Sequence, residues 1–163
     1  MPVHREVWWL PRPRRNKYKG GFPLHFETRL YRSLGSPPEA SILHPFGGRA
    51  DIGLINDLNP EVEPDTMHDA HCLPEEWADR FQVVVLDPPY DDKHSRELYD
   101  TGKLHPKKFM AEAVRVCKPG GYVVHYHWYL APRPAGCSWA RLITVVTRVY
   151  HKARIVSIFR KDP

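Results

Sequence analysis

Cysteine and long apolar runs are scarce in this 163-residue chain. Its three cysteines (Cys72, Cys117 and Cys137) stand at wide, unrelated spacings, which argues against a disulfide framework and against a structural zinc site. No stretch approaches the ~20 apolar residues that a membrane-spanning helix needs. The N-terminal run Trp8–Leu10 stops at Pro11 before it could form a secretory core. We therefore expect a cytoplasmic protein that does not enter a membrane.

Internal repeats and long low-complexity tracts are also missing, and the length fits one domain that buries roughly two-thirds of its unfolded surface. The net charge of +5 is concentrated at the two ends. Residues 141–163 carry six basic side chains against one acidic, and residues 1–20 carry six against one, among them Arg12, Arg14, Arg15, Lys17 and Lys19. Basic ends around an acidic centre favour a polyanion bound at the edges and a cationic small molecule inside. Ordinary solvated ends are the alternative.

Strand-like and helix-like segments alternate along the chain. We expect an irregular start over 1–22, a helix over 24–34, strands over 41–46, 52–58, 62–68 and 81–86, a helical turn over 73–79, a helix over 105–117 that ends at 118–121, a strand over 122–130, and a closing hairpin of 142–149 and 153–159. This order predicts an α/β fold whose sheet is mostly parallel and covered on both faces, with an antiparallel hairpin at the C-terminus.

The most informative motif is Asp87-Pro88-Pro89-Tyr90, which directly follows the apolar run 81–86. A β-branched run that stops at two prolines is typical of a buried strand that ends abruptly. Each proline fixes its own φ and keeps the preceding residue out of helical conformation. The Asp87 carboxylate and the Pro88 carbonyl are thus held at the carboxyl end of a strand, where open α/β sheets bind ligands. Two fixed acceptors beside an aromatic ring suit the amino group of a planar heterocycle.

This motif, placed after a hydrophobic strand, resembles the catalytic motif of the amino-methyltransferases. These enzymes move a methyl group from S-adenosylmethionine to an exocyclic nitrogen, usually adenine N6 or cytosine N4 in DNA. The resemblance covers about residues 40–160 and implies a Rossmann-like class I methyltransferase domain over 40–163, preceded by a basic arm and helix over 1–39. It implies catalytic roles for Asp87, Pro88, Pro89 and Tyr90. The first two would accept the amino hydrogens, and Tyr90 would stack on a base flipped out of its duplex.

The same resemblance implies S-adenosylmethionine as cofactor and a set of residues to hold it. His44-Pro45-Phe46-Gly47-Gly48 matches the family's turn for the methionine part, with His44 where an acid is usual. Asp57, with Leu58 beside it, matches the acid for the ribose hydroxyls, and Asp69, with Ala70, matches the one for the adenine amino group; Asp87 borders both ligands. Simpler interpretations are a glycine turn, a strand-end residue and a helix N-cap, respectively.

Histidines are numerous but do not predict a metal site. His125 and His127 share one strand face, and His68 lies three residues before His71, yet no third ligand has a matching spacing, so no metal is expected. The first two more naturally line the target pocket or pack near the carboxyl end of their strand.

A long target-recognition region, which the DNA enzymes of this kind normally carry, has no room in this sequence. The arm with Arg12, Arg14, Arg15, Lys17 and Lys19 could grip phosphates instead, or could be an extension strapped to the sheet by Trp8 and Trp9. Specificity could also come from a homodimer or from a specificity subunit. The first hypothesis is adenine-N6 methylation of DNA; an RNA amino-methyltransferase and a non-catalytic, methyltransferase-like binding subunit are the alternatives.

Overall fold

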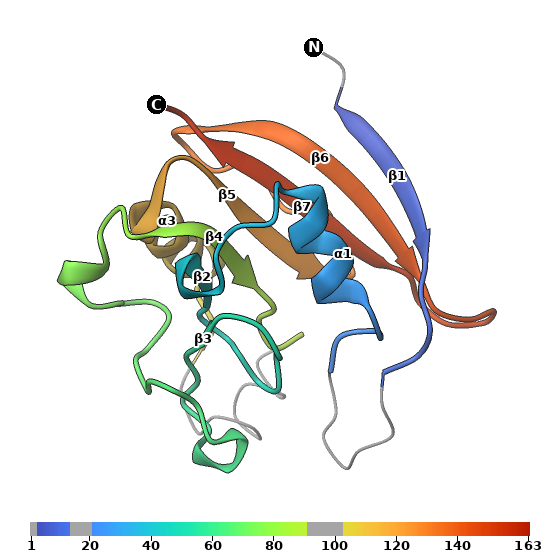
Figure 1. The fold of residues 1–163 in the computed structure, drawn as a ribbon, viewed down its shortest axis with the longest axis horizontal. Coiled ribbons are helices and arrows are strands. Elements are labelled where there is room, and N and C mark those ends of the chain that lie inside the picture. The colour runs from blue at the N-terminus through green and yellow to red at the C-terminus, as the bar shows by residue number, and fades with distance from the viewer. Residues whose placement is uncertain (1–2, 14–20, 91–102) are drawn as a thin grey trace.

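A computed structural model describes residues 3–13, 21–90 and 103–163. The strands described are β1 (His4–Trp9), β2 (Ile42–His44), β3 (Leu54–Ile55), β4 (Phe81–Leu86), β5 (Cys117–His127), β6 (Cys137–Val146) and β7 (Arg154–Lys161). The helices are α1 (Phe26–Ser33) and α3 (Pro106–Val116), with the short 3-10 turns η1 (Glu39–Ser41), η2 (Pro60–Val62) and η3 (Glu75–Trp77). The seven strands form one sheet in the order β1-β6-β7-β5-β4-β2-β3 (Figure 1).

Strand direction confirms the predicted fold class. β7 is antiparallel to both of its neighbours, β5 and β6, whereas every other pair in the sheet is parallel. The register places Leu86 beside His125, and His127 beside Ile155. The carboxyl ends of β4 and β5 therefore meet the first residues of β7 at one edge of the sheet.

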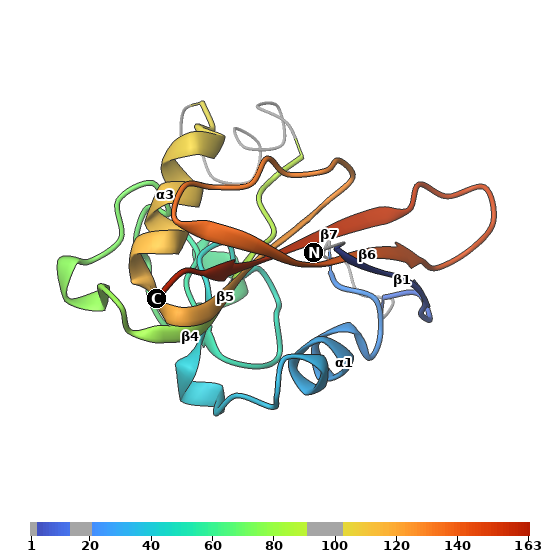
Figure 2. The ribbon, with the colours of Figure 1, turned by 90° about the horizontal axis from the view of Figure 1, so that it is seen from above.

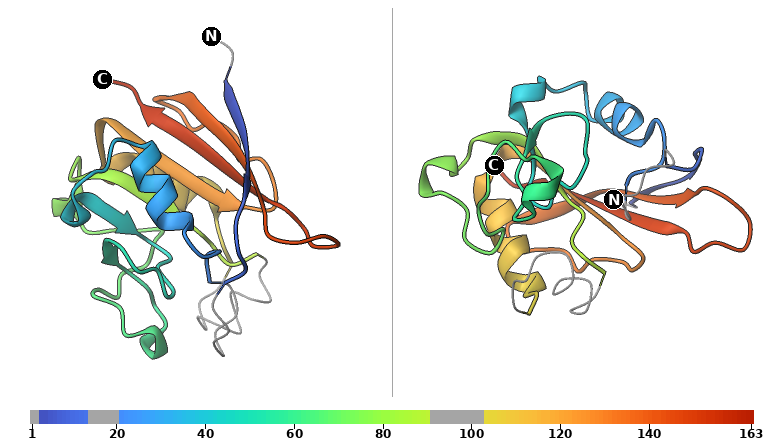
Figure 3. Two further views of the ribbon diagram at one scale, coloured as in Figure 1. Left: turned by 45° about the vertical axis from the view of Figure 1, so that its right-hand side comes forward. Right: turned by 90° about the horizontal axis from the view of Figure 1, so that it is seen from below.

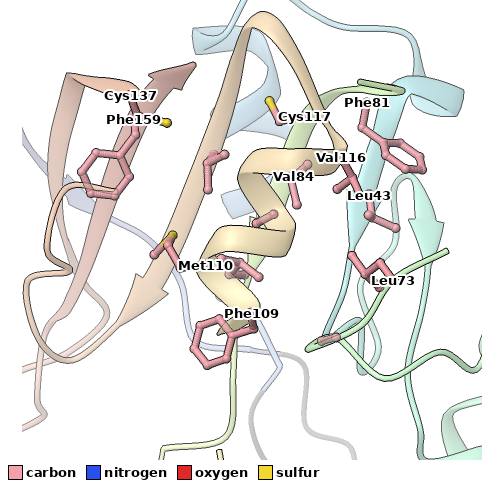
Figure 4. Packing of buried hydrophobic residues seen from close by; sticks show 14 of the residues in the cluster. Leu43, Leu73, Phe81, Val84, Phe109, Met110, Val116, Cys117, Cys137 and Phe159 are labelled. Atoms are coloured by element: carbon pink, nitrogen blue, oxygen red, sulfur yellow. The ribbon is translucent and has the colours of Figure 1, made fainter. Parts of the chain in front are cut away.

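The two faces of the sheet are covered by one helix each, as Figure 2 shows. α1 buries Phe26, Leu30 and Tyr31 against one face. α3 buries Phe109, Met110, Ala113 and Val116 against the other, around the cluster drawn in Figure 4. Both helices space their apolar residues three or four apart, so one stripe of each can face the sheet. Within the described part of the chain, no helix is both long enough and apolar enough to cross a membrane.

Three predicted elements differ from the structure. The start of the chain was expected to be irregular, but β1 pairs in parallel with β6 at the outer edge (Figure 3). The prolines and glycines that indicated irregular chain begin only at Pro11, after this strand ends. Trp8 is buried against Phe26, whereas Trp9 is exposed. Over 62–68, the structure has an isolated bridge between Asn56 and Thr66 in place of a strand.

The third difference is the beginning of β5. Residues 118–121 were expected to end the preceding helix as a turn, but they lie inside β5, where the pairing with β4 shifts register. Gly121 permits this irregularity, because a Cβ there would lie 2.7 Å from the backbone oxygen of Gln82. The connection from β2 to β3, residues 45–53, contains turns and no helix.

Candidate active site

The predicted catalytic motif lies where β4, β5 and β7 meet. Asp87 follows the last residue of β4 and is half-buried. Its carboxylate forms no hydrogen bond with another described residue. Burial raises the pKa of Asp87 to about 8, and the nearby positive charge of Arg154 only partly opposes this. Asp87 is therefore an acid without a donor partner in the described chain, poised to titrate near neutral pH.

Tyr90 is held on two sides. Arg154 Nε donates a hydrogen bond of 2.9 Å to the Tyr90 hydroxyl, and its guanidinium lies 5.0 Å from the ring centroid. On the other side the His127 ring meets Tyr90 edge-on, with centroids 5.0 Å apart. Burial and the Asp87 charge raise the pKa of Tyr90, so the phenol stays protonated. These contacts fix the ring beside Asp87.

A cavity of about 140 Å³ opens next to this ring. Its lining combines the motif with residues in or next to α3 and β5: Pro88, Pro89, Tyr90, Leu104, Pro106, Phe109, His127 and Tyr129. Mostly flat rings and prolines surround it, which suits a planar aromatic ligand.

His127 is the histidine among the residues that line this cavity. The residue is 1% exposed, and its Nδ1 has no hydrogen-bond partner. Burial, assisted by the neighbouring His125 and Arg154, lowers the pKa of His127 to about 3. His125 behaves alike: its Nδ1 is unpartnered, and burial lowers its pKa to about 4. Both imidazoles are neutral at physiological pH. Among the described residues, no group of His, Cys, Asp and Glu is arranged to hold a metal ion.

The glycine turn and Asp57 come together in the structure. Gly48 has a φ of 51°, and its N–H donates 2.7 Å to Asp57 Oδ2, while Asn59 N donates 2.9 Å to Oδ1. Asp57 is 1% exposed. Its carboxylate thus holds the backbone of the turn, and its predicted ribose role stays a prediction. Leu58, the next residue, is half-buried.

His44 points away from this turn. Its Nε2 lies 2.7 Å from the Tyr31 hydroxyl, 3.0 Å from the Ile52 carbonyl and 3.3 Å from Glu27 Oε1. A carbonyl can only accept, so Nε2 carries the proton. The residue that replaces the usual acid therefore joins β2 to α1. Phe46 lies on the opposite face of the sheet, where its ring packs edge-on against Phe109 at 5.2 Å.

Asn56 is a site residue that sequence reasoning missed. Its side chain is fully buried and makes four hydrogen bonds: Nδ2 donates to the carbonyls of Pro45 and His68, and Oδ1 accepts from Thr66 Oγ1 and His68 N. The amide thereby ties the glycine turn to the segment that precedes Asp69. Its position just before the predicted Asp57 was the only signal in the sequence.

Asp69 is exposed and anchors a short chain of contacts. Its Oδ1 lies 2.7 Å from His71 Nδ1, and His71 Nε2 accepts a hydrogen bond of 3.0 Å from His105 N. Nδ1 therefore donates to Asp69. Burial raises the pKa of Asp69, but the hydrogen bonds from His71 outweigh it and lower the pKa overall. Ala70, which stands between Asp69 and His71 in the sequence, is buried. This segment is thus attached to the start of α3, and its role toward an adenine stays a prediction.

A larger cleft, of about 480 Å³, lies between the start of α1 and the turn after β2. Gly48 and Ile52 form one wall, and Phe22 and Glu27 form the other. Its acidic side chains are Glu27, Asp51, Glu63 and Asp65, against one arginine, Arg49. Of the predicted phosphate-binding arm, Arg12 is exposed, whereas Arg14, Arg15, Lys17 and Lys19 lie outside the described residues.

Solved structures that superpose on this chain include methyltransferases. No protein-family model matches the chain, and no curated protein matches its sequence. TrmN from Thermus thermophilus superposes with a TM-score of 0.63 at 17% identity, over 88% of this chain and 50% of that one. The putative methyltransferase yhhF from Escherichia coli (TM-score 0.54, 14% identity, 94% and 91% covered) and a TehB-like SAM-dependent methyltransferase from Corynebacterium glutamicum (0.53, 16%, 87% and 90%) are also similar. The chain spans half the length of the Thermus protein and has the Rossmann-like methyltransferase fold.

Proposed function

We propose that this protein transfers a methyl group from S-adenosylmethionine to the exocyclic amino group of a nucleobase, with adenine N6 in DNA as the substrate. The observation that carries the proposal is Asp87: a half-buried carboxylate without a donor partner among the described residues, at the end of β4 and beside the fixed ring of Tyr90. An acceptor held in this way is complementary to an N–H group of a flat ligand.

The residues present fit the proposed cofactor in part. The glycine turn approaches the strand ends closely, since a Cβ on Gly47 would collide with Ile55 Cγ2. The cleft beside Gly48 has more acidic than basic side chains, which suits a sulfonium and an ammonium group. Asp57 fits less well, because backbone N–H groups already occupy both of its oxygens. When bound, the cofactor supplies the electrophilic methyl group.

The protein's own contribution is to position and polarise the amine. The lone pair of an aromatic amine is delocalised into its ring, so the amine is a weak nucleophile. Ionised Asp87 accepts one N–H and the Pro88 carbonyl accepts the other, which favours a pyramidal nitrogen. Tyr90 and the neighbouring prolines hold the ring of the base, and the cavity of about 140 Å³ receives it. Methyl transfer would form the new N–C bond as the S–CH3 bond of the sulfonium breaks, which leaves a neutral thioether, and one proton would leave the nitrogen toward Asp87 or solvent. Positioning and electrostatics supply the rate acceleration.

The proposal is tested by incubating the pure protein with labelled S-adenosylmethionine and with pools of DNA or RNA, and by identifying modified nucleosides by mass spectrometry. We expect N6-methyladenine in DNA. Asp87→Asn keeps the size of the side chain but exchanges one acceptor for a donor, so the rate should fall by about 100-fold or more. Exposed Glu76→Gln is the matched control and should leave the rate unchanged.

Two results would contradict the proposal. Label that appears only in RNA would move the substrate to RNA and overturn the DNA assignment. No transfer to any nucleic acid, together with no cofactor binding by calorimetry, would overturn the enzyme itself and favour a binding subunit with a methyltransferase fold.

A further inference from the structure

A second cavity, of about 210 Å³, also has Tyr90 in its wall. Tyr90 lines both this cavity and the one proposed for the target base. The remaining walls come from β5, from the β6–β7 hairpin and from the start of the chain, with Tyr126, Thr147, His151, Lys152 and Arg154 among them. Tyr90 is thus the residue that the two cavities share.

Positive charge gathers around this cavity. Lys152 and Arg154 line it, Arg148 Nη2 lies 3.5 Å from His151 Nδ1, and the charges of Arg148, Arg154 and Arg12 all act on that histidine. Together with burial, these charges lower the pKa of His151. None of the four cations forms an ion pair with a carboxylate of the described chain. Such a cluster, which has no ion-paired carboxylate among the described residues, is complementary to an anion with several charges.

The described residues use only two of the three nitrogens of the Arg154 guanidinium. Nε donates to Tyr90, and Nη1 donates 2.9 Å to the Lys152 carbonyl. No described residue accepts from Nη2, although a guanidinium has five N–H donors. A phosphate oxygen is the acceptor that a guanidinium held in this way recognises best.

The hairpin tip beside the cavity exposes large apolar groups. Tyr150 is fully exposed with a φ of 55°, a conformation that a tyrosine rarely adopts, and Val149 is also exposed. Trp128, 45% exposed, lies under the Lys152 ammonium at 4.2 Å. Figures 2 and 3 show the hairpin projecting from the body of the protein. Aromatic rings alternating with cations at an exposed edge are typical of surfaces that bind single-stranded nucleic acid.

We propose that this cavity binds the phosphodiester backbone of the DNA strand next to the flipped target base, with Arg148, Lys152 and Arg154 on the phosphates and Tyr150 stacked on a neighbouring base. The proposal rests on the proposed function for the identity of that base. It assigns target binding to the β6–β7 hairpin of the fold.

The test is a binding measurement that needs no methyl transfer. Fluorescence anisotropy of a labelled single-stranded DNA 20-mer is recorded at several salt concentrations for the full chain. Arg148→Gln/Lys152→Gln should weaken binding by about tenfold or more and reduce the slope of log affinity against log salt by about 1.4, since each phosphate contact on a single strand contributes about 0.7. Arg5→Gln/Lys118→Gln removes the same charge from exposed positions away from the cavity and should change neither quantity. Tyr150→Ala should weaken binding by about tenfold with an unchanged slope.

Equal affinities and slopes for the two double variants would overturn the proposal, provided that circular dichroism shows both to be folded. Tighter binding of an RNA strand of the same sequence would overturn the assignment to DNA. If binding depends on Arg148 and Lys152 but no base is methylated, the docking surface stands and the proposed function fails. If methylation occurs but is insensitive to this double variant, the proposed function stands and the docking surface fails.

Discussion

Arg154 Nε lies 2.9 Å from the hydroxyl of Tyr90, although the two residues are 64 positions apart in the chain. The contact exists because β7 is inserted antiparallel between β5 and β6, so its first residue reaches the edge at which β4 ends. Arg154 thereby has three roles: it fixes the Tyr90 ring, it lowers the pKa of Asp87 against the effect of burial, and it lines the cationic cavity.

Arg154→Met should move the pH dependence of activity. Removing the guanidinium removes the charge that opposes burial at Asp87, so the pKa of Asp87 should rise beyond about 8. In the proposed mechanism, ionised Asp87 accepts the amine hydrogen. We therefore expect kcat/KM at pH 7 to fall on the order of tenfold, with its rising limb at higher pH. Arg154→Lys keeps a positive charge, so the midpoint of its pH profile should lie close to that of the parent protein. An unshifted pH profile in Arg154→Met would show that Asp87 does not set it.

Asp87→Asn should stabilise the protein at alkaline pH. The pKa of Asp87 is about 8 in the folded state, against ~3.9 in an unfolded chain. Between these values the unfolded state releases a proton that the folded state keeps, so the free energy of unfolding falls as pH rises toward 8. Because Asp87 is partly exposed, the effect should be smaller than the full pKa difference implies. The variant should be more stable than the parent by on the order of 2 kcal/mol at pH 8, and equally stable near pH 4. Urea denaturation at both pH values measures this; a difference independent of pH would contradict it.

His127→Phe should reduce the sensitivity of the protein to acid. The pKa of His127 is about 3 when folded and ~6.5 when unfolded. Below pH 6.5 the unfolded state binds a proton that the folded state does not, so stability is lost as pH falls. The variant should flatten the plot of unfolding free energy against pH by up to about 1.4 kcal/mol per unit between pH 6 and 4. The same slope as in the exposed-site control His4→Gln would contradict the buried, neutral state of His127.

Asn56→Ala should strongly destabilise the protein, because the Asn56 side chain is fully buried and hydrogen-bonded. The substitution removes four hydrogen bonds and takes the Nδ2 donor away from the buried Pro45 carbonyl and from the partly buried His68 carbonyl. We expect a loss of about 3 kcal/mol in the free energy of unfolding. Asn59→Ala, which removes one partly exposed capping bond to Glu61 N, should cost only about 1 kcal/mol. Equal losses in urea denaturation would mean that the Asn56 network does not hold the turn.

Much of the fold followed from local pattern. The strand 81–86 and the helix 105–117 were predicted almost to the residue, because a buried strand and an amphipathic helix each leave a periodic signal. β1 was missed because an edge strand that pairs with β6 depends on a partner more than 130 residues away. The start of β5 was missed because 118–121 reads as a turn, whereas Gly121 allows the strand to continue past a close backbone approach.

The site divides in the same way. The position of Asp87 at a strand end could be predicted because proline geometry is local, and the chemistry proposed for the motif starts from residues that are adjacent in sequence. The environment of His44 could not be recognised in advance, since its partners Tyr31, Glu27 and Ile52 come from α1 and from the following loop. The same is true of Asp57, whose carboxylate is engaged by the backbone of a turn nine residues earlier.

By itself, the sequence determined the α/β order of elements, the rigid pair of acceptors at Asp87 and Pro88, and the presence of a glycine turn, because each is set by residues close together in the chain. Only the tertiary structure decided which charges surround Asp87, that Arg154 holds Tyr90, and that the cations of the β6–β7 hairpin border a cavity beside that ring. Burial and long-range pairing set those relationships, and both depend on how distant strands are ordered in the sheet.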